Sequence, residues 1–440
     1  MAVKPGYKLT EVGVIPEDWE CNEIGELALR VGSGITPTGG EKIYKEYGIP
    51  FVRSQNIGWG DLLLDDLAYI TDKTHESFQS SEIKQGDVLL NITGASIGRS
   101  AVADKRLNRG NVNQHVCEIR PTNNLDSYYL NNYLLSANGQ KQIDSFQAGG
   151  NRQGLNYQQV RSFKVPLPPL PEQHAIATAL SDVDTLITKL DQLIAKKRDI
   201  KQATMQQLLT GQTRLPGFSG EWEVKRLGEF GSTYGGLTGK TKSDFGSGNA
   251  FYITFMNIMS NVMINDSEFG MVRINQNEKQ NSVLENDIFF NGSSETPEEV
   301  GLCAVLKAKL DNVYLNSFCF GYRLRINEIA DGLFLAYYFR SNVGRELLKS
   351  LAQGATRYNL SKRALLMVEF QLPPFPEQQA IATILSDMDA EITALESRRK
   401  KTRALKQGMM QELLTGRIRL PIAKHHMVSD RTNPTVETRQ

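Results

Sequence analysis

Cysteine, histidine and tryptophan are scarce in this sequence: 440 residues contain four, five and three of them. No two cysteines have the C-x-x-C spacing, and the histidines do not complete a ligand cluster with them, which excludes the usual zinc motifs and favours free thiols. The thiols belong to Cys21, Cys117, Cys303 and Cys319.

Long apolar runs and an excess of one charge are missing too. No stretch approaches the roughly 18 apolar residues that cross a bilayer, and residues 1–20 are charged and lack the apolar core of a secretory signal. The sequence therefore predicts a cytoplasmic protein with no membrane partner. Fifty Lys and Arg against 49 Asp and Glu give a net charge of +1, so any nucleic-acid contact must come from local patches or from a complex.

Catalytic motifs are also absent. The glycine-rich run 235–241 is close to a phosphate-binding loop, but Tyr234 stands where that motif needs its first glycine. Residues 167–170 have the prolines of a methyltransferase box without the polar residue that holds the target amine. We therefore predict no catalytic residue, cofactor site or metal site in this chain.

What the sequence does contain is an internal repeat. Residues 168–173, Pro-Pro-Leu-Pro-Glu-Gln, recur at 373–378 as Pro-Pro-Phe-Pro-Glu-Gln, and the match runs without a gap to Arg-Leu-Pro at 214–216 and 419–421. Roughly 30 of about 50 aligned positions are identical. Weaker sequence matches outside this block, such as that of Trp19 with Trp222, indicate that the whole chain is a duplicated unit.

Each repeated block predicts a long helix. The prolines can open a helix, and Glu172 and Glu377 in its first turn favour the positive end of the helix dipole. Apolar residues then recur at steps of four and three, as in a coiled-coil seam. The predicted seam residues are Ile176, Leu180, Val183, Ile187, Leu190, Ile194, Ile381, Leu385, Met388, Ile392 and Leu395.

Two such helices in one chain favour antiparallel pairing, with a globule at each end and a pseudo-two-fold axis. The alternative is that each stripe packs on its own globule. Residues 14–19 could supply the tryptophan-containing segment that the second repeat lacks after Pro421. The predicted fold class is α+β, divided into the following parts: an N-terminal closing segment 1–20, a first globule 21–165, a central helix 166–215, a second globule 216–370, a C-terminal helix 371–422 and a disordered tail 423–440.

The globules contain short strand-like runs separated by polar turns, for example at 49–52 and 287–290. The turns carry side chains that can pair with base edges, although Asn, Ser and Gly are also the residues that turns require. Arg152 and Arg357 fall at matched positions, where an arginine can bind phosphate or guanine. The candidate DNA-binding residues are Arg53, Gln55, Asn56, Asn91, Thr93, Asn113, Gln114, Arg152, Asn257, Asn291, Ser293, Arg357, Tyr358 and Asn359. The basic run 398–403 is either a solvated helix face or a further contact.

The paired Pro-Glu-Gln blocks that open long helices, the repeated Leu-Leu-Thr-Gly ending and the tryptophan before each globule resemble the specificity subunits of type I restriction-modification systems. The resemblance covers about residues 14–421. It implies a non-catalytic DNA-binding subunit in which each globule, a target-recognition domain, reads one half of a bipartite target and the helices set the gap.

The same resemblance implies the partners: double-stranded DNA, two adenine-N6 methyltransferase subunits and two motor-nuclease subunits. It implies that this chain binds no cofactor, while the complex uses S-adenosylmethionine, with ATP and Mg²⁺ for restriction. Two alternatives from other classes stay open: a structural adaptor that joins two partners without reading DNA, and an autonomous DNA-modifying enzyme.

Overall fold

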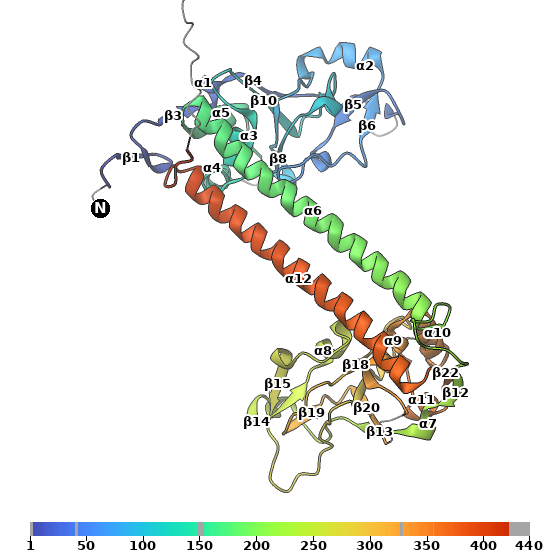
Figure 1. The fold of residues 1–440 in the computed structure, drawn as a ribbon. Helices are drawn as coiled ribbons and strands as arrows, with labels where there is room; N and C mark the ends of the chain where they lie inside the picture. The colour runs from blue at the N-terminus through green and yellow to red at the C-terminus, as the bar shows by residue number, and fades with distance from the viewer. Residues whose placement is uncertain (1–2, 40–42, 148–153, 326–328, 355, 422–440) are drawn as a thin grey trace, which may run out of the picture. The chain divides into compact units, whose positions relative to one another are not determined.

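The computed structural model describes residues 3–39, 43–147, 154–325, 329–354 and 356–421 (Figure 1). The chain forms two compact units: unit 1 comprises residues 1–190 with 398–440, and unit 2 comprises residues 191–397. Each unit contains an α+β globule and one segment of each of two long helices, α6 (Leu170–Leu208) and α12 (Phe375–Leu413). The predicted disordered tail lies outside the described residues.

Unit 1 is built on a four-stranded antiparallel sheet in the order β4-β10-β7-β8, and a second sheet has the order β6-β5-β9. Two-stranded pairs join β1 with β2 and β3 with β11. The strands are β1 (Tyr7–Thr10), β2 (Gly13–Pro16), β3 (Glu20–Glu23), β4 (Ala28–Ser33), β5 (Ile49–Val52), β6 (Ala68–Ile70), β7 (Val88–Asn91), β8 (Ser100–Val102), β9 (Asn111–Val112), β10 (Val116–Pro121) and β11 (Lys164–Leu167).

Short helices of unit 1 begin at polar caps. Asp126 accepts the N–H of Tyr129 at the start of α3, and Ser136 accepts the N–H of Gly139 at the start of α4. The helices are α1 (Ile24–Leu27), α2 (Asp72–Ser77), α3 (Ser127–Leu135), α4 (Ala137–Ser145) and α5 (Tyr157–Arg161).

Unit 2 repeats this topology. Its main sheet has the order β13-β20-β16-β18, its second sheet the order β15-β14-β19, and two-stranded pairs join β12 with β22 and β17 with β21. The strands are β12 (Glu223–Arg226), β13 (Gly231–Gly235), β14 (Phe245–Ile253), β15 (Phe269–Val272), β16 (Ile288–Asn291), β17 (Ser293–Ser294), β18 (Cys303–Val305), β19 (Val313–Leu315), β20 (Cys319–Leu324), β21 (Tyr358–Asn359) and β22 (Glu369–Leu372). The helices are α7 (Leu227–Phe230), α8 (Phe255–Ser260), α9 (Gly332–Arg340), α10 (Asn342–Ser350) and α11 (Lys362–Leu366).

The two globules are therefore one fold in two copies, although their sequences have diverged. β7 and β16 occupy the same central place in the main sheet, and so do β10 and β20. The duplication inferred from the helical blocks extends through both globules, and the predicted α+β class with an internal repeat is confirmed.

The long helices begin and end close to where the repeat predicts. α6 and α12 are both 39 residues long, and each is followed three residues later by a glycine with positive φ, +70° at Gly211 and +67° at Gly416. A left-handed glycine is the residue that reverses the chain after a helix.

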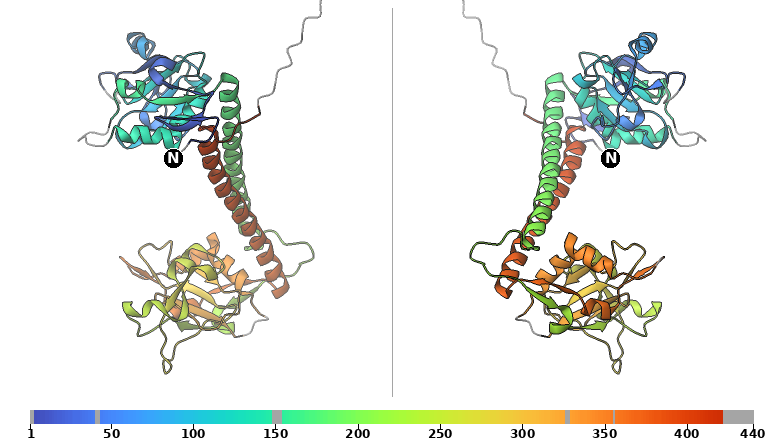
Figure 2. Two further views of the ribbon diagram at one scale, coloured as in Figure 1. Left: turned by 90° about the vertical axis from the view of Figure 1, so that its left-hand side faces the viewer. Right: turned by 90° about the vertical axis from the view of Figure 1, so that its right-hand side faces the viewer.

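In each unit a segment of α6 lies beside a segment of α12 (Figure 2). In unit 1, Lys406 of α12 binds Asp184 of α6 at 2.7 Å. In unit 2, Lys197 pairs with Glu391 at 2.7 Å and Lys201 with Asp389 at 2.5 Å. As the residue number of the ion-pair partner on α6 rises, that of its partner on α12 falls. The two helices therefore pack together antiparallel.

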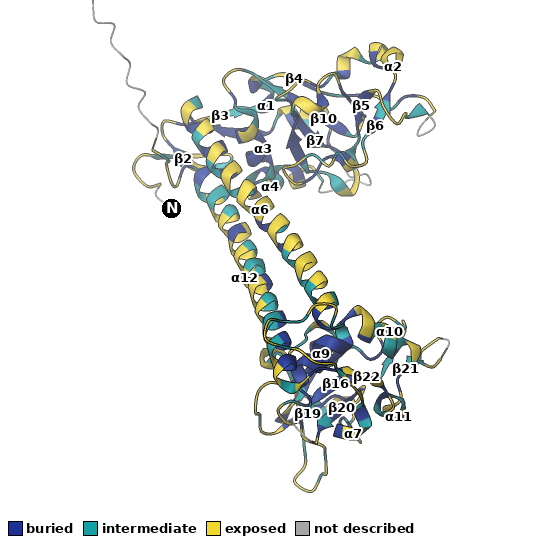
Figure 3. Cartoon of the chain, turned by 45° about the vertical axis from the view of Figure 1, so that its right-hand side comes forward, coloured by how far each residue is buried: buried dark blue, intermediate teal, exposed yellow. Residues whose placement is uncertain are grey.

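Seam residues at the start of each helix join the core of the neighbouring globule. Ile176 and Leu180 pack in the main core of unit 1 with Leu414, and Ile381 and Leu385 pack in the main core of unit 2. The buried positions of the helices thus gather at their ends (Figure 3). Leu190, Ile194 and Ile392 are buried farther along, whereas the following seam residues are half-buried: Val183, Ile187, Met388 and Leu395.

Within each unit the start of one long helix thus packs on the globule, and farther along ion pairs join the two helices. No helix in the described part of the chain is long and apolar enough to cross a membrane.

Candidate nucleic-acid interface

The polar turn after β5 is closed by Asp66. Arg53 donates to the backbone carbonyl of Asp66 at 3.0 Å, and Gln55 hydrogen-bonds its carboxylate. Asn56 is buried, and its amide donates to the carbonyl oxygens of Leu63 and Asp66 at 2.9 and 3.0 Å. Asn56 therefore holds the turn from inside, while Gln55 is exposed on its surface.

Four side chains of unit 1 form a hydrogen-bonded row. His115 Nδ1 lies 2.7 Å from Thr93 Oγ1, and His115 Nε2 lies 3.3 Å from Gln114 Nε2. Thr36 donates its hydroxyl to Gln114 Oε1. Asn113 accepts the backbone N–H of His115 at 3.0 Å and so fixes the turn that carries the row. The row joins the segments that follow β4 and β7 to the turn before β10.

Asn91 lies beneath this row at the end of β7. It is fully buried, and its amide donates to the carbonyl oxygen of Ser54 at 2.8 Å, which ties the turn containing Gln55 to the central strand. The unit 1 candidates therefore meet at one end of the main sheet, except Arg152, which lies outside the described residues.

Asn257 of unit 2 makes its hydrogen bonds within its own segment of the chain. It is fully buried in α8, donates to the carbonyl oxygen of Asn265 at 2.7 Å and accepts the Asn265 N–H at 3.0 Å. Its amide closes a loop, as that of Asn56 does in unit 1.

The remaining candidates of unit 2 come together at β17 and β21. Ser293 lies opposite Asn359, and buried Asn291 accepts the Ser293 N–H at 3.1 Å. Arg357 and Asn359 are exposed, and Tyr358 is half-buried. Unit 1 has the same edge, formed there by a single bridge between Thr93 and Gly154.

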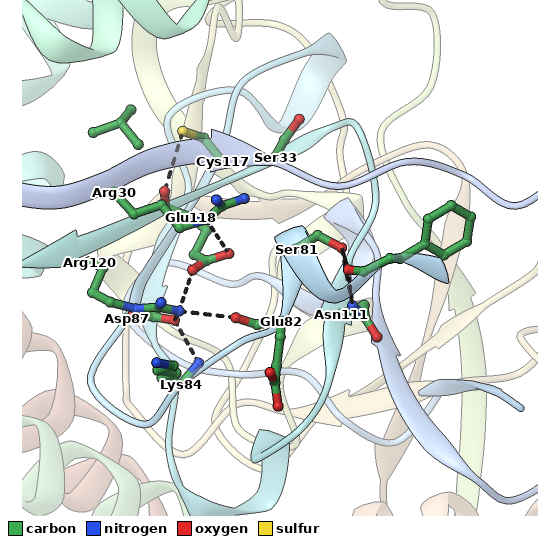
Figure 4. Close-up of polar contacts among 12 residues, drawn as sticks. Arg30, Ser33, Ser81, Glu82, Lys84, Asp87, Asn111, Cys117, Glu118 and Arg120 are labelled. Carbon is green, nitrogen blue, oxygen red and sulfur yellow. Dashed lines mark hydrogen bonds and ion pairs between the residues drawn. The ribbon is translucent and has the colours of Figure 1, made fainter. Parts of the chain in front are cut away.

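A buried ionic network supports the main sheet of unit 1 (Figure 4). Glu118 of β10 is fully buried, 2.5 Å from Arg120 and 3.2 Å from Arg30, and Arg120 also binds Asp87 at 2.7 Å. Burial raises the pKa of Glu118 to about 7 and the charge of Asp87 adds to the rise, while the two arginines oppose it.

Unit 2 keeps half of this network and replaces the rest. Arg323 binds Asp287 at 2.6 Å, as Arg120 binds its aspartate, but Gly321 occupies the place of Glu118. Tyr234 fills the space over this glycine, and its hydroxyl donates to Asp287 at 2.6 Å. Burial and the Asp287 charge raise the pKa of Tyr234, so its hydroxyl stays protonated and donates.

The first-turn glutamate of each long helix binds the chain segment that leads into a globule. In unit 1 buried Glu172 accepts the indole N–H of Trp19 at 3.2 Å and binds Arg419 at 2.6 Å. Arg419 also binds Asp18 at 2.9 Å, and these two acids raise the pKa of the guanidinium. These contacts hold Asp18 and Trp19 of the N-terminal segment against Arg419, which follows α12, and against the first turn of α6.

Unit 2 has the same arrangement. Glu377 accepts the indole N–H of Trp222 at 3.3 Å and binds Arg214 through two contacts of 2.6 Å. The adjacent glutamines match too: Gln173 accepts the N–H of Asp126 at 2.8 Å, and Gln378 accepts the N–H of Asp331 at 2.9 Å.

The motif that resembles a phosphate loop has a structural role. Lys240 is buried against Glu278 at 2.5 Å and donates to the carbonyl oxygen of Arg273 at 2.6 Å. Gln280 bonds both backbone groups of Thr238. The lysine is thus neutralised, and the loop is closed by residues that follow β15. Among the described residues, no cluster of acidic, histidine or cysteine side chains could hold a metal ion, and all four cysteines are free.

Sequence reasoning missed several residues of these sites. In the sequence, His115 could be recognised only as one residue of a polar turn. Phe318, at the equivalent place in unit 2, is apolar, so the search for polar side chains did not select it. The contacts of Trp19 and Arg419 with Glu172 span 153 and 247 residues. The recurrence of Trp, Glu and Arg at matched places in both repeats was the available signal.

These features define a class of protein: two copies of one α+β domain, each followed by a long helix, with matched polar edges and no catalytic constellation in the described residues. A family model for the type I restriction modification DNA specificity domain matches twice, at residues 16–198 and 219–404. The chain therefore belongs to this family, and it is a non-catalytic specificity subunit of a type I restriction-modification system with DNA-binding target-recognition domains.

Known proteins resemble the chain over nearly its full length. A Methanocaldococcus jannaschii protein that carries the name of the MjaX type I restriction enzyme specificity subunit is 26% identical over 435 residues, 94% of this chain and 97% of the relative. The EcoKI specificity subunit of Escherichia coli is 21% identical over 429 residues, 91% and 89% of the two chains.

The fold is also found in solved structures. The type I restriction-modification S subunit from M. genitalium superimposes with a TM-score of 0.55 at 15% identity, covering 93% of this chain and 99% of that one. A chain from a study of assembly and conformational transition of a type I system gives 0.56 at 18% identity, covering 92% and 99%.

Proposed function

We propose that each globule reads one half of a split, asymmetric sequence in double-stranded DNA. The observation that carries this proposal is the pair of matched polar edges. They have the same backbone topology and different side chains, with Thr93 and His115 in one unit and Ser293 and Phe318 in the other. A common scaffold with different surface groups suits two unlike half-sites, since hydrogen-bonding and apolar groups distinguish bases in the major groove.

The DNA contacts that we propose divide into two kinds. Gln55, Thr93, Gln114, Ser293 and Tyr358 are partly or fully accessible and suit contacts with base edges, while exposed Arg357 and Asn359 suit phosphate or guanine. Asn56, Asn91, Asn113, Asn257 and Asn291 are buried, and each fixes a neighbouring turn through its amide. Arg53 supports its turn through Asp66, and Arg152 stays in the proposal on its match with Arg357.

The long helices have two proposed tasks. They set the spacing between the half-sites, as dimeric repressors set the spacing of paired half-sites, and they dock two adenine-N6 methyltransferase subunits and, for restriction, two motor-nuclease subunits. The complex would use S-adenosylmethionine, with ATP and Mg²⁺ for cleavage, in the cytoplasm where its DNA target lies. A net charge of +1 fits a subunit whose partners supply much of the phosphate neutralisation.

Exchange of a globule tests this function. Residues 20–165 are replaced by the equivalent globule of another family member in the assembled methyltransferase complex, and methylated adenines are mapped by sequencing. We expect one half of the methylated motif to change and the other half, with the gap, to stay. An unchanged motif would contradict the proposal and favour an adaptor that does not read DNA. Methylation or cleavage by this polypeptide alone would favour an autonomous enzyme.

A further inference from the structure

The turns that precede β10 and β20 present one side chain at the same place in each unit. Asn113 accepts the N–H of His115 at 3.0 Å, and Asn316 accepts the N–H of Phe318 at 2.9 Å. In both turns an asparagine side chain thus fixes the backbone two residues later, which is a recurrent way to stabilise a turn.

Both turns are also tied to neighbouring strands. Asn113 donates its backbone N–H to Val52 at 3.0 Å, and Asn316 donates to Ile253 at 3.2 Å. The next strand then starts in the same register, with Val116 opposite Asn91 in unit 1. Cys319 lies opposite Asn291 in unit 2. His115 and Phe318 are therefore equivalent positions on equally constrained backbone.

A glycine packs against each turn and leaves it little freedom. A Cβ atom at Gly34 would collide with the carbonyl oxygen of Val112, and one at Gly236 would collide with that of Asn316. The backbone of each turn is thus held from both sides, so the Cα atom that carries the presented side chain keeps its position before DNA arrives. Preorganisation of this kind lowers the entropic cost of binding.

The two presented side chains differ in chemistry. His115 is part of the hydrogen-bonded row with Thr93 and Gln114. Phe318 is an apolar ring that stands 68% exposed. It stands two residues after Asn316, and its backbone carbonyl oxygen would lie 3.2 Å from a Cβ atom at Gly292, the residue between Asn291 and Ser293 at the polar edge. An exposed aromatic ring on a constrained turn, close to hydrogen-bonding groups, matches the thymine edge in the major groove, where an apolar methyl group stands beside a hydrogen-bond acceptor.

We propose that Phe318 is a specificity-determining residue that packs against the methyl group of a thymine in the half-site read by unit 2. His115 holds the equivalent position in unit 1 and makes a polar base contact instead. The inference rests on the proposed function, because it requires that the edges face DNA.

The test uses the assembled methyltransferase complex and a duplex containing its mapped target. Each thymine of the unit 2 half-site is replaced in turn by deoxyuridine, which removes only the methyl group. For the native protein, we expect one of these replacements to weaken DNA binding about four-fold, which corresponds to the transfer free energy of one buried methyl group. The same replacement should leave the affinity of Phe318→Ala unchanged, and Phe318→Ala should accept other bases at that position.

A matched control is Phe251→Ala. Phe251 is also an exposed phenylalanine of unit 2, 46% accessible, but it lies on β14 opposite Met271, away from β17 and β21. This variant should keep the full response to deoxyuridine. His115→Phe should alter only the half-site of unit 1. Unfolding temperatures of all variants, expected to match the native protein, verify that they fold.

Several results would overturn the inference. Uniform sensitivity of native and Phe318→Ala proteins to every deoxyuridine would mean that the ring contacts no methyl group. Loss of methyltransferase binding by Phe318→Ala would assign the ring to a protein interface. If globule exchange changes the motif while Phe318→Ala does not, only this inference fails. If exchange leaves the motif unchanged, the proposed function fails with it.

Discussion

Glu118 is a buried carboxyl group whose protonation is linked to folding. Its pKa rises from an ordinary value of 4.5 to about 7, because burial disfavours the charged form and Asp87 repels it. The folded chain therefore binds this proton more tightly than the unfolded chain. Between pH 4.5 and 7 the folded state carries more protons, so this group makes stability fall as pH rises.

Replacing Glu118 by Gln should remove this dependence. The slope of unfolding free energy against pH should become more positive between pH 4.5 and 7, by at most about 1.4 kcal/mol per pH unit, the limit for one proton. Thermal unfolding of the full chain at several pH values measures it. Exposed Glu46 of the same globule provides the control, since Glu46→Gln should leave the slope as it is. Equal slopes for E118Q and the native chain would show that the carboxyl group titrates normally.

At the scale of residues, the sequence predicted which types of side chain gather at the edges but not their individual tasks. Asn56 and Asn257 are residues of the type that can read bases, yet the amides of both are hydrogen-bonded to backbone groups inside the globule. Turn formation and base recognition use the same amides, so local sequence cannot separate them. Glu172 was placed correctly in the first turn of a helix, while its contacts with Trp19 and Arg419 depend on the tertiary fold.

At the scale of elements, the repeat and its apolar spacing were sufficient to predict both long helices, although the predicted parts 166–215 and 371–422 extend beyond α6 and α12 at both ends. The strand-like runs at 49–52 and 287–290 were also visible, because they are short apolar runs between turns, and they correspond to β5 (Ile49–Val52) and β16 (Ile288–Asn291). The sheet order was not predictable, since β4 and β13 pair with β10 and β20, which lie far along the chain from them. The identity of the two topologies emerged only from that order.

The glycines after the helices should respond unequally to alanine. Gly211 and Gly416 both have positive φ, which costs an alanine roughly 1–2 kcal/mol. A methyl group at Gly416 would also collide with Pro16 and approach Trp19 to 3.2 Å, whereas at Gly211 it would meet Trp222 at an ordinary 3.5 Å. Gly416→Ala should therefore lower the unfolding temperature more than Gly211→Ala. Equal shifts would mean that the N-terminal segment does not pack on this turn in solution.

At the scale of the whole molecule, the proposed spacing role of the helices makes a geometric prediction. Seven residues inserted in register into both α6 and α12 should add about 10 Å of helix, or about three base pairs. The methylated motif should keep both halves and gain a longer gap, which methylation mapping reads directly. A control that inserts seven residues after Pro421, outside both helices, should leave the gap unaltered. A constant gap in the helix variant would contradict the spacing role.

The main sheets of the two units carry different side chains at the same place. This difference limits which strands can be exchanged between the units. β4 and β10 of unit 1 place Gly32 opposite Glu118, whereas β13 and β20 of unit 2 place Tyr234 opposite Gly321. A chimera that grafted β10 alone into unit 2 would press the glutamate into the tyrosine ring. The reverse graft would leave two glycines facing a void. β10 and β20 are therefore not interchangeable parts, and an exchange that moves either strand has to carry its paired strand, β4 or β13, with it.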